Sequence, residues 1–380
     1  TTFCRHETGV DRAANGANVD YTQPLTDGPT HHGFDCYYGD DVPNFPPYAF
    51  IENDRFPEIP DRPFEAGMPG VPGVMAASWR PERLLAVETE KAVAYIREHR
   101  DRPFFLMVSL TAPHTPIAPT PEFEGRSRAG RYGDFVEEMD HRIGEMLAAL
   151  RDAGIDERTI VVFSSDNGSS FQDGGTAGGE RYGGRFGSIL DLGHNPSGRF
   201  RGMKSDSWEG GHRIPFLVRW PGVIPAGSVT DALTCDLDLY ATLADVAGVT
   251  LSEGDAVDSR SLMPLLRGGE PVRTSLVAQS GNGILCYISG DWKLIAGSGS
   301  GGSLNPYGQA DLLPAYDAAS GRWRNVQLYN LASDPEERYD RAALHPQRVA
   351  RMMEALAREV RRGGTAADWQ QVAWTSRFGE

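Results

Sequence analysis

The residues best suited to metal chemistry are an aspartate and an asparagine that stand side by side. Asp166 and Asn167 follow the apolar run 159–164, which has the composition of a buried strand, and a glycine comes next. A carboxylate and an amide oxygen are hard donors of the kind that Ca²⁺ or Mg²⁺ binds. An Asx turn explains the same pair without a metal, and two ligands are too few for either ion. The pair is therefore a candidate for part of a metal site whose other carboxylates lie elsewhere.

A basic segment runs from 181 to 213 in a protein that is otherwise acidic. It holds six Lys or Arg against three acids, a local charge of +3, and the histidines His194 and His212. The six are Arg181, Arg185, Arg199, Arg201, Lys204 and Arg213. Many glycines accompany them, and the combination predicts a flexible cradle for a sulfate or phosphate group. A solvated basic face is the alternative, which is weakened because acids dominate elsewhere.

Two further groups of polar residues lie on predicted loops. His114 stands between two prolines in APHTP, just past the apolar run 104–110, so it is held on a stiff loop and not in a helix. A surface histidine without a role is the alternative. Asp40 and Asp41 could add carboxylates to a metal site, but they stand in a proline-rich stretch and follow no apolar run. A solvated pair is the preferred interpretation of these two aspartates.

Composition places the chain among soluble globular proteins. It has 380 residues, 40% of them hydrophobic and 23% charged, with a formal charge of -15. This charge repels nucleic acid and anionic membrane surfaces, so an anionic substrate needs a local basic pocket. No apolar run approaches the ~18 to 20 residues of a membrane span. The four cysteines form no C-x-x-C pair, and they fit neither a disulfide framework nor a structural zinc site.

The predicted elements place these residues at the ends of strands. Helical spacing begins at Pro81 and recurs over 134–150, and strand-like apolar runs follow at 104–110 and 159–164. This alternation predicts an α/β fold with a mixed, largely parallel sheet between helices. Ligands of such sheets bind beyond the carboxyl ends of the strands, where His114 and Asp166-Asn167 fall. Eight prolines between 41 and 72 predict an extended surface loop there.

The pattern changes after residue 268. Before this point, a helix is predicted over 237–247. After it, short strands are predicted at 275–278, 284–289, 292–296 and 327–330. A last helix carries Val349, Met352, Met353, Leu356 and Val360 in register. We therefore predict two domains, a partial catalytic domain over 1–268 and a small C-terminal α+β domain over 269–380.

Several motifs, taken in order, resemble the sulfatase family of the alkaline-phosphatase-like superfamily. They are GFDCYYG, DVPNFPPY and ENDR within 33–55, SLTAPHTPIAP at 109–119, SSDNG at 164–168, HNPSGRFRGMKSDSWEGGHRIPFLVRWPG at 194–222, SLMPLLRG at 261–268, GDWKLI at 290–295 and LYNLASDPEER at 328–338. The resemblance covers nearly the whole chain and implies the alkaline-phosphatase-like fold. It also implies hydrolysis of sulfate monoesters, as an arylsulfatase-like sulfuric ester hydrolase.

The resemblance also implies roles for individual residues. Asp166 and Asn167 are expected to bind one calcium ion, and His114 to contact the sulfate group and assist the leaving group. Lys204 is expected to bind a sulfate oxygen, so His114 and Lys204 are the catalytic candidates. His194 and Arg201 complete the predicted substrate-binding set. A metal ion, a lysine and a histidine together neutralise the charge on an ester that is being cleaved.

Three motifs of the family are absent from the 380 residues. They are an early aspartate pair, a C-x-P-S-R-like motif whose cysteine or serine is oxidised to formylglycine, and a G-K-W-H-L-G-like motif that supplies another lysine and histidine. The segment 4–8, CRHET, lacks the proline and the arginine of the second motif. We therefore expect a fragment that begins beyond these motifs and is inactive by itself, with formylglycine in the missing N-terminal segment.

Two alternatives to a sulfatase are a phosphate-ester hydrolase of the same superfamily, which differs at one residue of the site, and a protein that binds an anion without catalysis. Phosphodiesterases and phosphonate hydrolases of the superfamily usually carry S-D-H-G where this chain has SDNG, and a histidine suits zinc or manganese. Asn167 favours calcium and sulfate esters. A non-catalytic anion-binding fragment is the other alternative. The expected partner is a small-molecule or carbohydrate sulfate ester, and a periplasmic or secreted location is favoured over a cytoplasmic one for the full-length protein.

Overall fold

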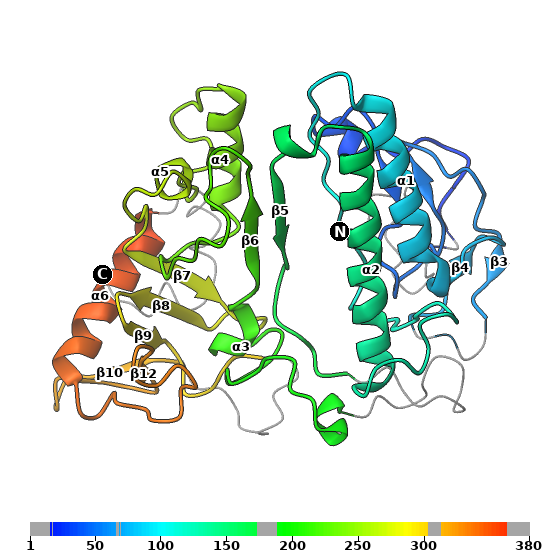
Figure 1. Ribbon diagram of the computed structural model, residues 1–380. Helices are drawn as coiled ribbons and strands as arrows, with labels where there is room; N and C mark the ends of the chain where they lie inside the picture. Colours follow the sequence, from blue (N-terminus) through cyan, green and yellow to red (C-terminus); the bar gives the residue numbers. More distant parts are fainter. Residues whose placement is uncertain are drawn as a thin grey trace. The chain divides into compact units, whose positions relative to one another are not determined.

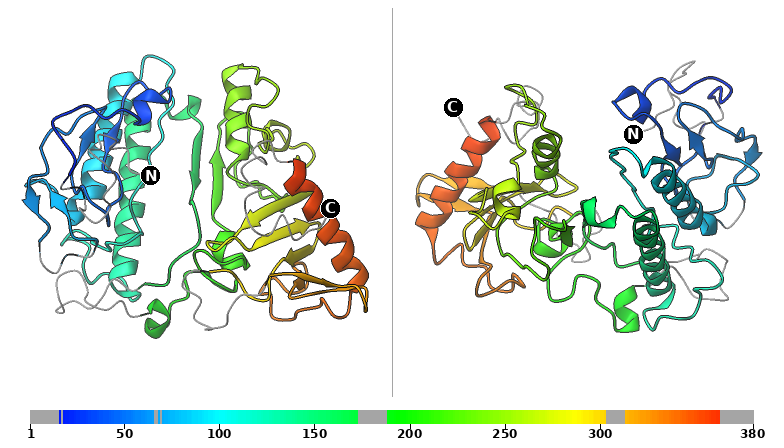
Figure 2. Two further views of the ribbon diagram at one scale, coloured as in Figure 1. Left: turned by 180° about the vertical axis from the view of Figure 1, so that it is seen from behind. Right: turned by 45° about the horizontal axis from the view of Figure 1, so that its top comes forward.

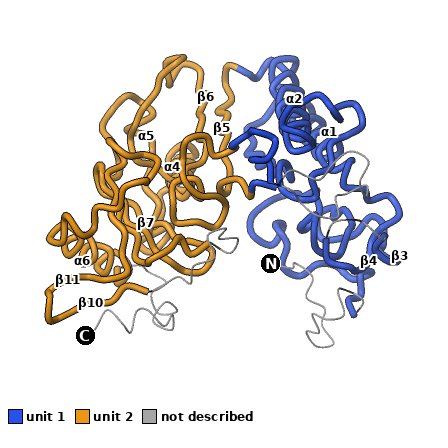
Figure 3. The backbone as a smooth tube through the Cα atoms, turned by 90° about the horizontal axis from the view of Figure 1, so that it is seen from below, with its two compact units in different colours: residues 1–156, 171–195 blue, residues 157–170, 196–380 orange. Residues whose placement is uncertain are grey.

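The computed structural model describes residues 16, 18–65, 68, 70–172, 188–302 and 313–362. The chain divides into two compact units, the first formed by residues 1–156 and 171–195 and the second by 157–170 and 196–380 (Figure 3). The predicted boundary at 268 falls inside the second unit, so the division into a catalytic and a C-terminal domain stays a prediction.

Two helices form the framework of the first unit. α1 (Leu84–His99) continues the short 3-10 helix η3 (Pro81–Arg83), and α2 (Gly130–Asp152) runs beside it (Figures 1 and 2). Pro81 suits a helical first turn because that turn has no partner for its N–H groups. α2 ends before Gly154, whose φ of +69° lets the chain leave the helix in the left-handed conformation.

The proline-rich stretch of this unit is not the surface loop that we predicted. Beyond the 3-10 turn η2 (Pro29–His31), short strands pair there, β1 (Tyr38–Gly39) with β2 (Ile51–Glu52) and β3 (Arg62–Pro63) with β4 (Val74–Met75). A hydrophobic cluster lies among them, and its most buried members are Tyr48, Ala49, Ile51, Met75, Ala76 and Trp79. Prolines prevent helices and long ladders, but they do not prevent the aromatic side chains between them from packing into a core.

The apolar run 104–110 is not the buried strand that we predicted. It makes no ladder with any other residue in the described part of the chain, and its side chains alternate between exposed and half-buried. Phe105 and Met107 are 55% and 64% exposed. A strand is defined by its hydrogen-bonded neighbour, and β propensity alone does not provide one.

The second unit begins with an antiparallel strand pair. After the turn η4 (Asp156–Arg158), β5 (Val161–Ser164) pairs with β6 (Phe216–Arg219). The short helix α3 (Glu209–His212) precedes β6, and α4 (Asp238–Ala247) and α5 (Met263–Leu266) follow it. The loops beside β5 and α3 carry four of the six residues that were predicted to bind metal or substrate, namely Asp166, Asn167, Arg201 and Lys204.

A four-stranded antiparallel sheet completes the second unit, in the order β12-β9-β8-β7. Its strands are β7 (Ser275–Gln279), β8 (Leu285–Ser289), β9 (Trp292–Ile295) and β12 (Gln327–Asn330), and the hairpin β10 (Ala315–Asp317) with β11 (Arg322–Arg324) lies beside it. α6 (Pro346–Arg362) covers one face of the sheet, where Met353 and Leu356 pack on Leu294 and Leu328 (Figure 1). The predicted strands and final helix of this part are confirmed.

The opposite face of this sheet packs against the segment that leads to α3. Successive side chains of a strand point to opposite faces, so Cys286 and Ile295 lie on the face away from α6. They form a second cluster with Ile284, Tyr329 and Trp208. The sheet therefore supports the segment in which Lys204 was predicted to bind substrate.

Candidate functional site

The aspartate and asparagine of the predicted metal site lie directly beyond the end of β5. Asp166 is exposed and Asn167 is half-buried. The next residue, Gly168, donates its backbone N–H to the Gly211 carbonyl at 3.0 Å. A Cβ atom on Gly168 would lie 1.9 Å from the Gly210 carbonyl oxygen, so only glycine permits this close approach. The loop after β5 is thereby held against α3.

Lys204 belongs to the same part of the structure. Its backbone N–H donates to the Ser169 carbonyl at 2.8 Å, which joins the segment before α3 to the loop after β5. Asp206 tightens the turn because its carboxylate accepts the Met203 N–H at 2.8 Å. The Lys204 side chain is half-exposed, and its ammonium makes no ion pair with any residue that the structure describes. The backbone of Lys204 is therefore joined to the loop that carries Asp166 and Asn167, and the ammonium of Lys204 is available for an anionic ligand.

Arg201, predicted to bind substrate, is engaged within the protein. Its guanidinium lies 3.7 Å from the centre of the Trp208 ring and donates to the Glu337 carbonyl at 3.0 Å. A longer contact of 3.4 Å reaches the Tyr329 hydroxyl. These contacts fix the segment on the sheet, and a role of Arg201 in substrate binding stays a prediction.

His114 and His194 belong to the first unit. The His114 Nδ1 lies 2.6 Å from the Thr115 carbonyl, and a hydrogen bond there places the proton on Nδ1. Nε2 then has a free lone pair on an exposed side chain. The loop is anchored by Ala112 and Ile117, both buried against α1 and α2. His194 is exposed, with its ring centre 6.4 Å from that of Tyr132.

Two residues of the predicted basic segment, Arg181 and Arg185, lie outside the described residues. The others that carry its positive charge belong to the second unit, from Arg199 to Arg213. Arg199 and Arg213 are exposed, and they pair with Glu336 at 3.8 Å and Glu209 at 3.0 Å. Lys204 is thus the cation of this segment best placed to meet a ligand.

Asp166 and Asn167 fit a calcium ion as part of its ligand set. Their oxygens are the hard donors that calcium prefers, and calcium takes about six to eight of them. Within the described residues, no group of three or more His, Cys, Asp or Glu side chains is arranged to hold a metal. Two donors are too few for calcium, so the role of Asp166 and Asn167 as metal ligands stays a prediction.

Asp236 is a neighbour of this pair that the sequence did not reveal. The Ser164 hydroxyl lies 2.9 and 3.0 Å from its two carboxylate oxygens, which ties the loop before α4 to the end of β5. Burial raises the pKa of Asp236, and the charge of Asp166 raises it further. No motif marks Asp236, since its position depends on the pairing of β5 with β6.

The prediction of a solvated pair at residues 40 and 41 is wrong for Asp40. This side chain is buried and accepts a hydrogen bond from the Trp79 indole at 3.3 Å. Burial raises the pKa of Asp40 to about 6. On α1, Glu88 has one carboxylate oxygen sealed from solvent without a partner in the described structure, and burial and Asp40 raise its pKa to about 8.

These two carboxyls predict an unusual dependence of stability on pH. Each folded-state pKa is raised, so the folded chain keeps protons that the unfolded chain loses above its ordinary pKa of about 4. The free energy of unfolding should therefore fall as the pH rises from about 4 to about 8. Glu88→Gln should reduce this fall by at least about 1 kcal/mol, measured by denaturant unfolding at both ends of the range.

The matched control is Glu90→Gln, an exposed glutamate on the same helix. It should leave the pH dependence as in the unmutated chain. Equal pH dependence of the Glu88→Gln variant and the unmutated chain would show that Glu88 is ionised in the fold.

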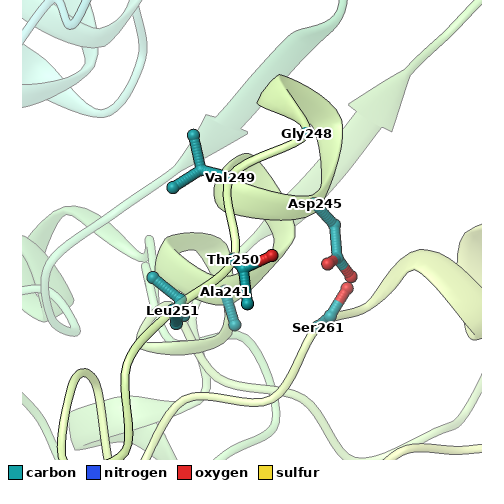
Figure 4. Close-up of a pocket in the computed structure, with 7 residues that line it drawn as sticks. All are labelled: Ala241, Asp245, Gly248, Val249, Thr250, Leu251 and Ser261. Atoms are coloured by element: carbon teal, nitrogen blue, oxygen red, sulfur yellow. The ribbon is translucent and has the colours of Figure 1, made fainter.

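A hollow at the end of α4 contains none of the predicted site residues. Its volume is about 390 Å³, and its walls come from α4 and the loops that follow it. Asp245 and Ser261 face each other across it, and Asp245 is its one ionisable side chain (Figure 4). We assign no function to this hollow.

In the described part of the chain, no helix is long and apolar enough to cross a membrane.

Comparison with known proteins identifies the family. The sequence profile of the Sulfatase family matches residues 5–249. N-acetylgalactosamine-6-O-sulfatase of Bacteroides thetaiotaomicron is 33% identical over 285 residues, which cover 75% of this chain and 52% of that protein. Steryl-sulfatase of Rattus norvegicus is 42% identical over 174 residues, which cover 46% of this chain and 28% of that protein.

Solved structures agree with this result. One from Bacteroides thetaiotaomicron, described under the metabolism of multiple glycosaminoglycans, gives a TM-score of 0.73 at 27% identity and covers 89% of this chain and 75% of that chain. A sulfatase from Pseudoalteromonas sp. gives a TM-score of 0.56 at 24% identity over 72% of this chain and 52% of that one, and it supports the fold alone. The chain belongs to the sulfatase family, and its fold is of the predicted α/β class. It spans about half the length of the first curated relative.

Proposed function

We propose that the full-length protein hydrolyses sulfate monoesters. The observation that carries this proposal is the position of Lys204, whose backbone is hydrogen-bonded to the loop that presents Asp166 and Asn167. An ammonium group on a segment that is joined to a loop with two oxygen donors suits an anionic ester bound next to a divalent cation. Membership of the sulfatase family supports sulfate as the anion.

Each residue of the candidate site has a role that follows from the chemistry of its side chain. Asp166 and Asn167 would hold calcium, which supplies positive charge next to the ester oxygens. Lys204 binds a sulfate oxygen through a charge-assisted hydrogen bond, which strengthens as charge develops. The Nε2 lone pair of His114 takes up a proton from solvent, and the imidazolium then gives this proton to the leaving-group oxygen. The proposed nucleophile is a formylglycine, and no C-x-P-S-R-like motif that would carry it occurs among these 380 residues.

The identity of residue 167 supports sulfate over phosphate esters. An amide oxygen is a neutral, hard donor suited to calcium, whereas an imidazole favours zinc or manganese. The phosphodiesterase and phosphonate hydrolase alternative therefore lacks its characteristic ligand in SDNG. Anion binding without catalysis is a third possibility, which no contact of the described residues favours.

The substrate class is a carbohydrate sulfate ester. The relative aligned over the larger share of this chain is named for N-acetylgalactosamine 6-O-sulfate, and the steryl-sulfatase match covers less of it. Release of inorganic sulfate from 6-O-sulfated N-acetylgalactosamine, from a steroid sulfate and from 4-nitrophenyl sulfate tests this directly. The sugar should be the best of the three substrates by kcat/KM.

A preference for the steroid ester would remove the carbohydrate assignment but keep the sulfatase activity. No sulfate release from any of the three would contradict the proposed activity. We also propose that the full-length protein is located in the periplasm or outside the cell. Fractionation of the host cells would test this location.

A further inference from the structure

A fully buried lysine lies beneath the segment that carries Lys204. Lys293, on β9, has no solvent-exposed surface. Its ammonium lies 3.0 Å from a carboxylate oxygen of Glu209 and 2.9 Å from one of Glu337. The His212 imidazole is 3.1 Å away. The lysine points to the face of the sheet that packs against α3, opposite to α6.

The members of this cluster shift one another's pKa values: burial raises the pKa of Glu337, and Lys293 opposes this rise. Burial acts to raise the pKa of Glu209, but the charge of Lys293 lowers it to about 2. Burial and Lys293 lower the pKa of His212 to about 4, so this imidazole is neutral near neutral pH. A buried charge without a partner is costly, so the cluster holds its shape only while all of its members stay together.

The cluster ties three distant segments at one point. Glu209 is the first residue of α3, and its backbone N–H donates to the other Glu337 carboxylate oxygen at 2.6 Å. Glu337 follows β12, and its carbonyl accepts the hydrogen bond from Arg201. One ammonium on β9 therefore holds both the start of α3 and the loop after β12.

Hydrogen bonds of α3 connect the buried lysine cluster to the candidate site. Gly211 accepts the hydrogen bond from Gly168, directly after Asn167, and Lys204 precedes Glu209 by one tight turn. Gly210 donates to the Arg201 carbonyl at 2.7 Å. A shift of α3 would therefore move Lys204 and the loop after β5 together with it.

We propose that Lys293, with Glu209 and Glu337, is a positioning group that holds Lys204 at the distance from Asp166 and Asn167 that binding of a sulfate ester requires. This inference rests on the proposed function. Lys293 does not touch substrate, because it is fully buried. It acts through α3.

The alternative is that the cluster only stabilises the second unit, and another buried ion pair provides the control. Arg273 and Asp238 are buried and bonded to each other, and they join α4 to the loop at 258–260. Their hydrogen bonds lie within residues 235–273, outside the segment from Arg201 to Arg213. Loss of either pair should destabilise the unit, but only loss of the Lys293 cluster should loosen the segment that carries Lys204.

The test compares Lys293→Met and Arg273→Met in the full-length protein by hydrogen exchange and kinetics. Lys293→Met should speed amide exchange over 202–211 and lower kcat/KM for a sulfate ester on the order of 10- to 100-fold. The inhibition constant of inorganic sulfate should rise as well. Arg273→Met should leave exchange over 202–211 and kcat/KM within about threefold of the unmutated protein.

If Lys293→Met does not fold, Glu337→Gln and the triple variant Lys293→Met/Glu209→Gln/Glu337→Gln take its place, since the triple variant leaves no buried charge unpaired. Unchanged exchange over 202–211 in a folded variant would overturn the inference, as would equal effects of the Arg273 variant. The exchange experiment does not depend on turnover. An unmutated protein that cleaves no sulfate ester would instead refute the proposed function.

Discussion

Lys204→Ala in the full-length protein is expected to lower kcat/KM for a sulfate ester roughly 30- to 900-fold, about 2 to 4 kcal/mol. The lost contact is a charge-assisted hydrogen bond to an oxygen that gains charge in the transition state, so the larger part of the loss should appear in kcat. The fold should be unaffected, because the ammonium makes no ion pair with the described residues. Steady-state kinetics with thermal unfolding as a fold check measures both.

Arg199→Ala is the matched control within the same segment. Arg199 is a cation with a side chain that is 64% exposed, and its nearest carboxylate oxygen, on Glu336, is 3.8 Å away. Such a pair contributes little, so kcat/KM should change by less than about threefold. A Lys204 effect as small as that of Arg199 would remove Lys204 from the site.

Asn167→His should change both the bound metal and the preferred ester. An imidazole replaces a hard amide oxygen, so zinc or manganese should displace calcium in the purified protein. The ratio of kcat/KM for an aryl sulfate to that for an aryl phosphate should fall on the order of 10-fold or more, and a reversal is consistent with the same reasoning. Metal analysis and paired assays on one preparation measure the two effects.

Asn167→Asp is the control that distinguishes the effect of the donor type from the effect of any substitution at this position. It keeps an oxygen donor of nearly the same size, so calcium and the preference for sulfate should persist. If Asn167→His still binds calcium and prefers sulfate to the same degree, residue 167 is not a metal ligand. If Asn167→Asp behaves like Asn167→His, the donor type is not what selects the metal.

Sequence periodicity predicted the elements that depend on local signals. The predicted helix at 237–247 agrees with α4, because Gly248 ends it with a φ of +70°. The predicted helix at 134–150 begins four residues earlier, at Gly130. Asp134 therefore lies within the helix, where it is buried and accepts hydrogen bonds from the N–H groups of Gly125 and Ser127. Such loop contacts leave no periodic signal.

Features that need distant partners were not predictable in this way. The run 104–110 has the composition of a strand, but pairing decides whether a strand forms. Prolines suggested an exposed loop at 41–72, whereas the aromatic residues between them form a core.

The candidate site shows the same division. Residue types and motifs indicated Asp166, Asn167 and Lys204, which the structure brings together through backbone contacts. The cluster of Lys293, Glu209 and Glu337 could not be predicted from the sequence. Glu209 and Glu337 are 128 positions apart, and a single buried lysine in GDWKLI has no distinctive pattern.

The most direct test of a calcium-dependent sulfatase site is the metal content and ester preference of the unmutated full-length protein. Metal analysis of a purified sample is paired with kcat/KM on 4-nitrophenyl sulfate and 4-nitrophenyl phosphate. We expect one calcium ion for each chain and a higher kcat/KM on the sulfate ester. Two zinc ions for each chain, together with faster cleavage of the phosphate ester, would contradict the assignment and favour the phosphodiesterase-like alternative.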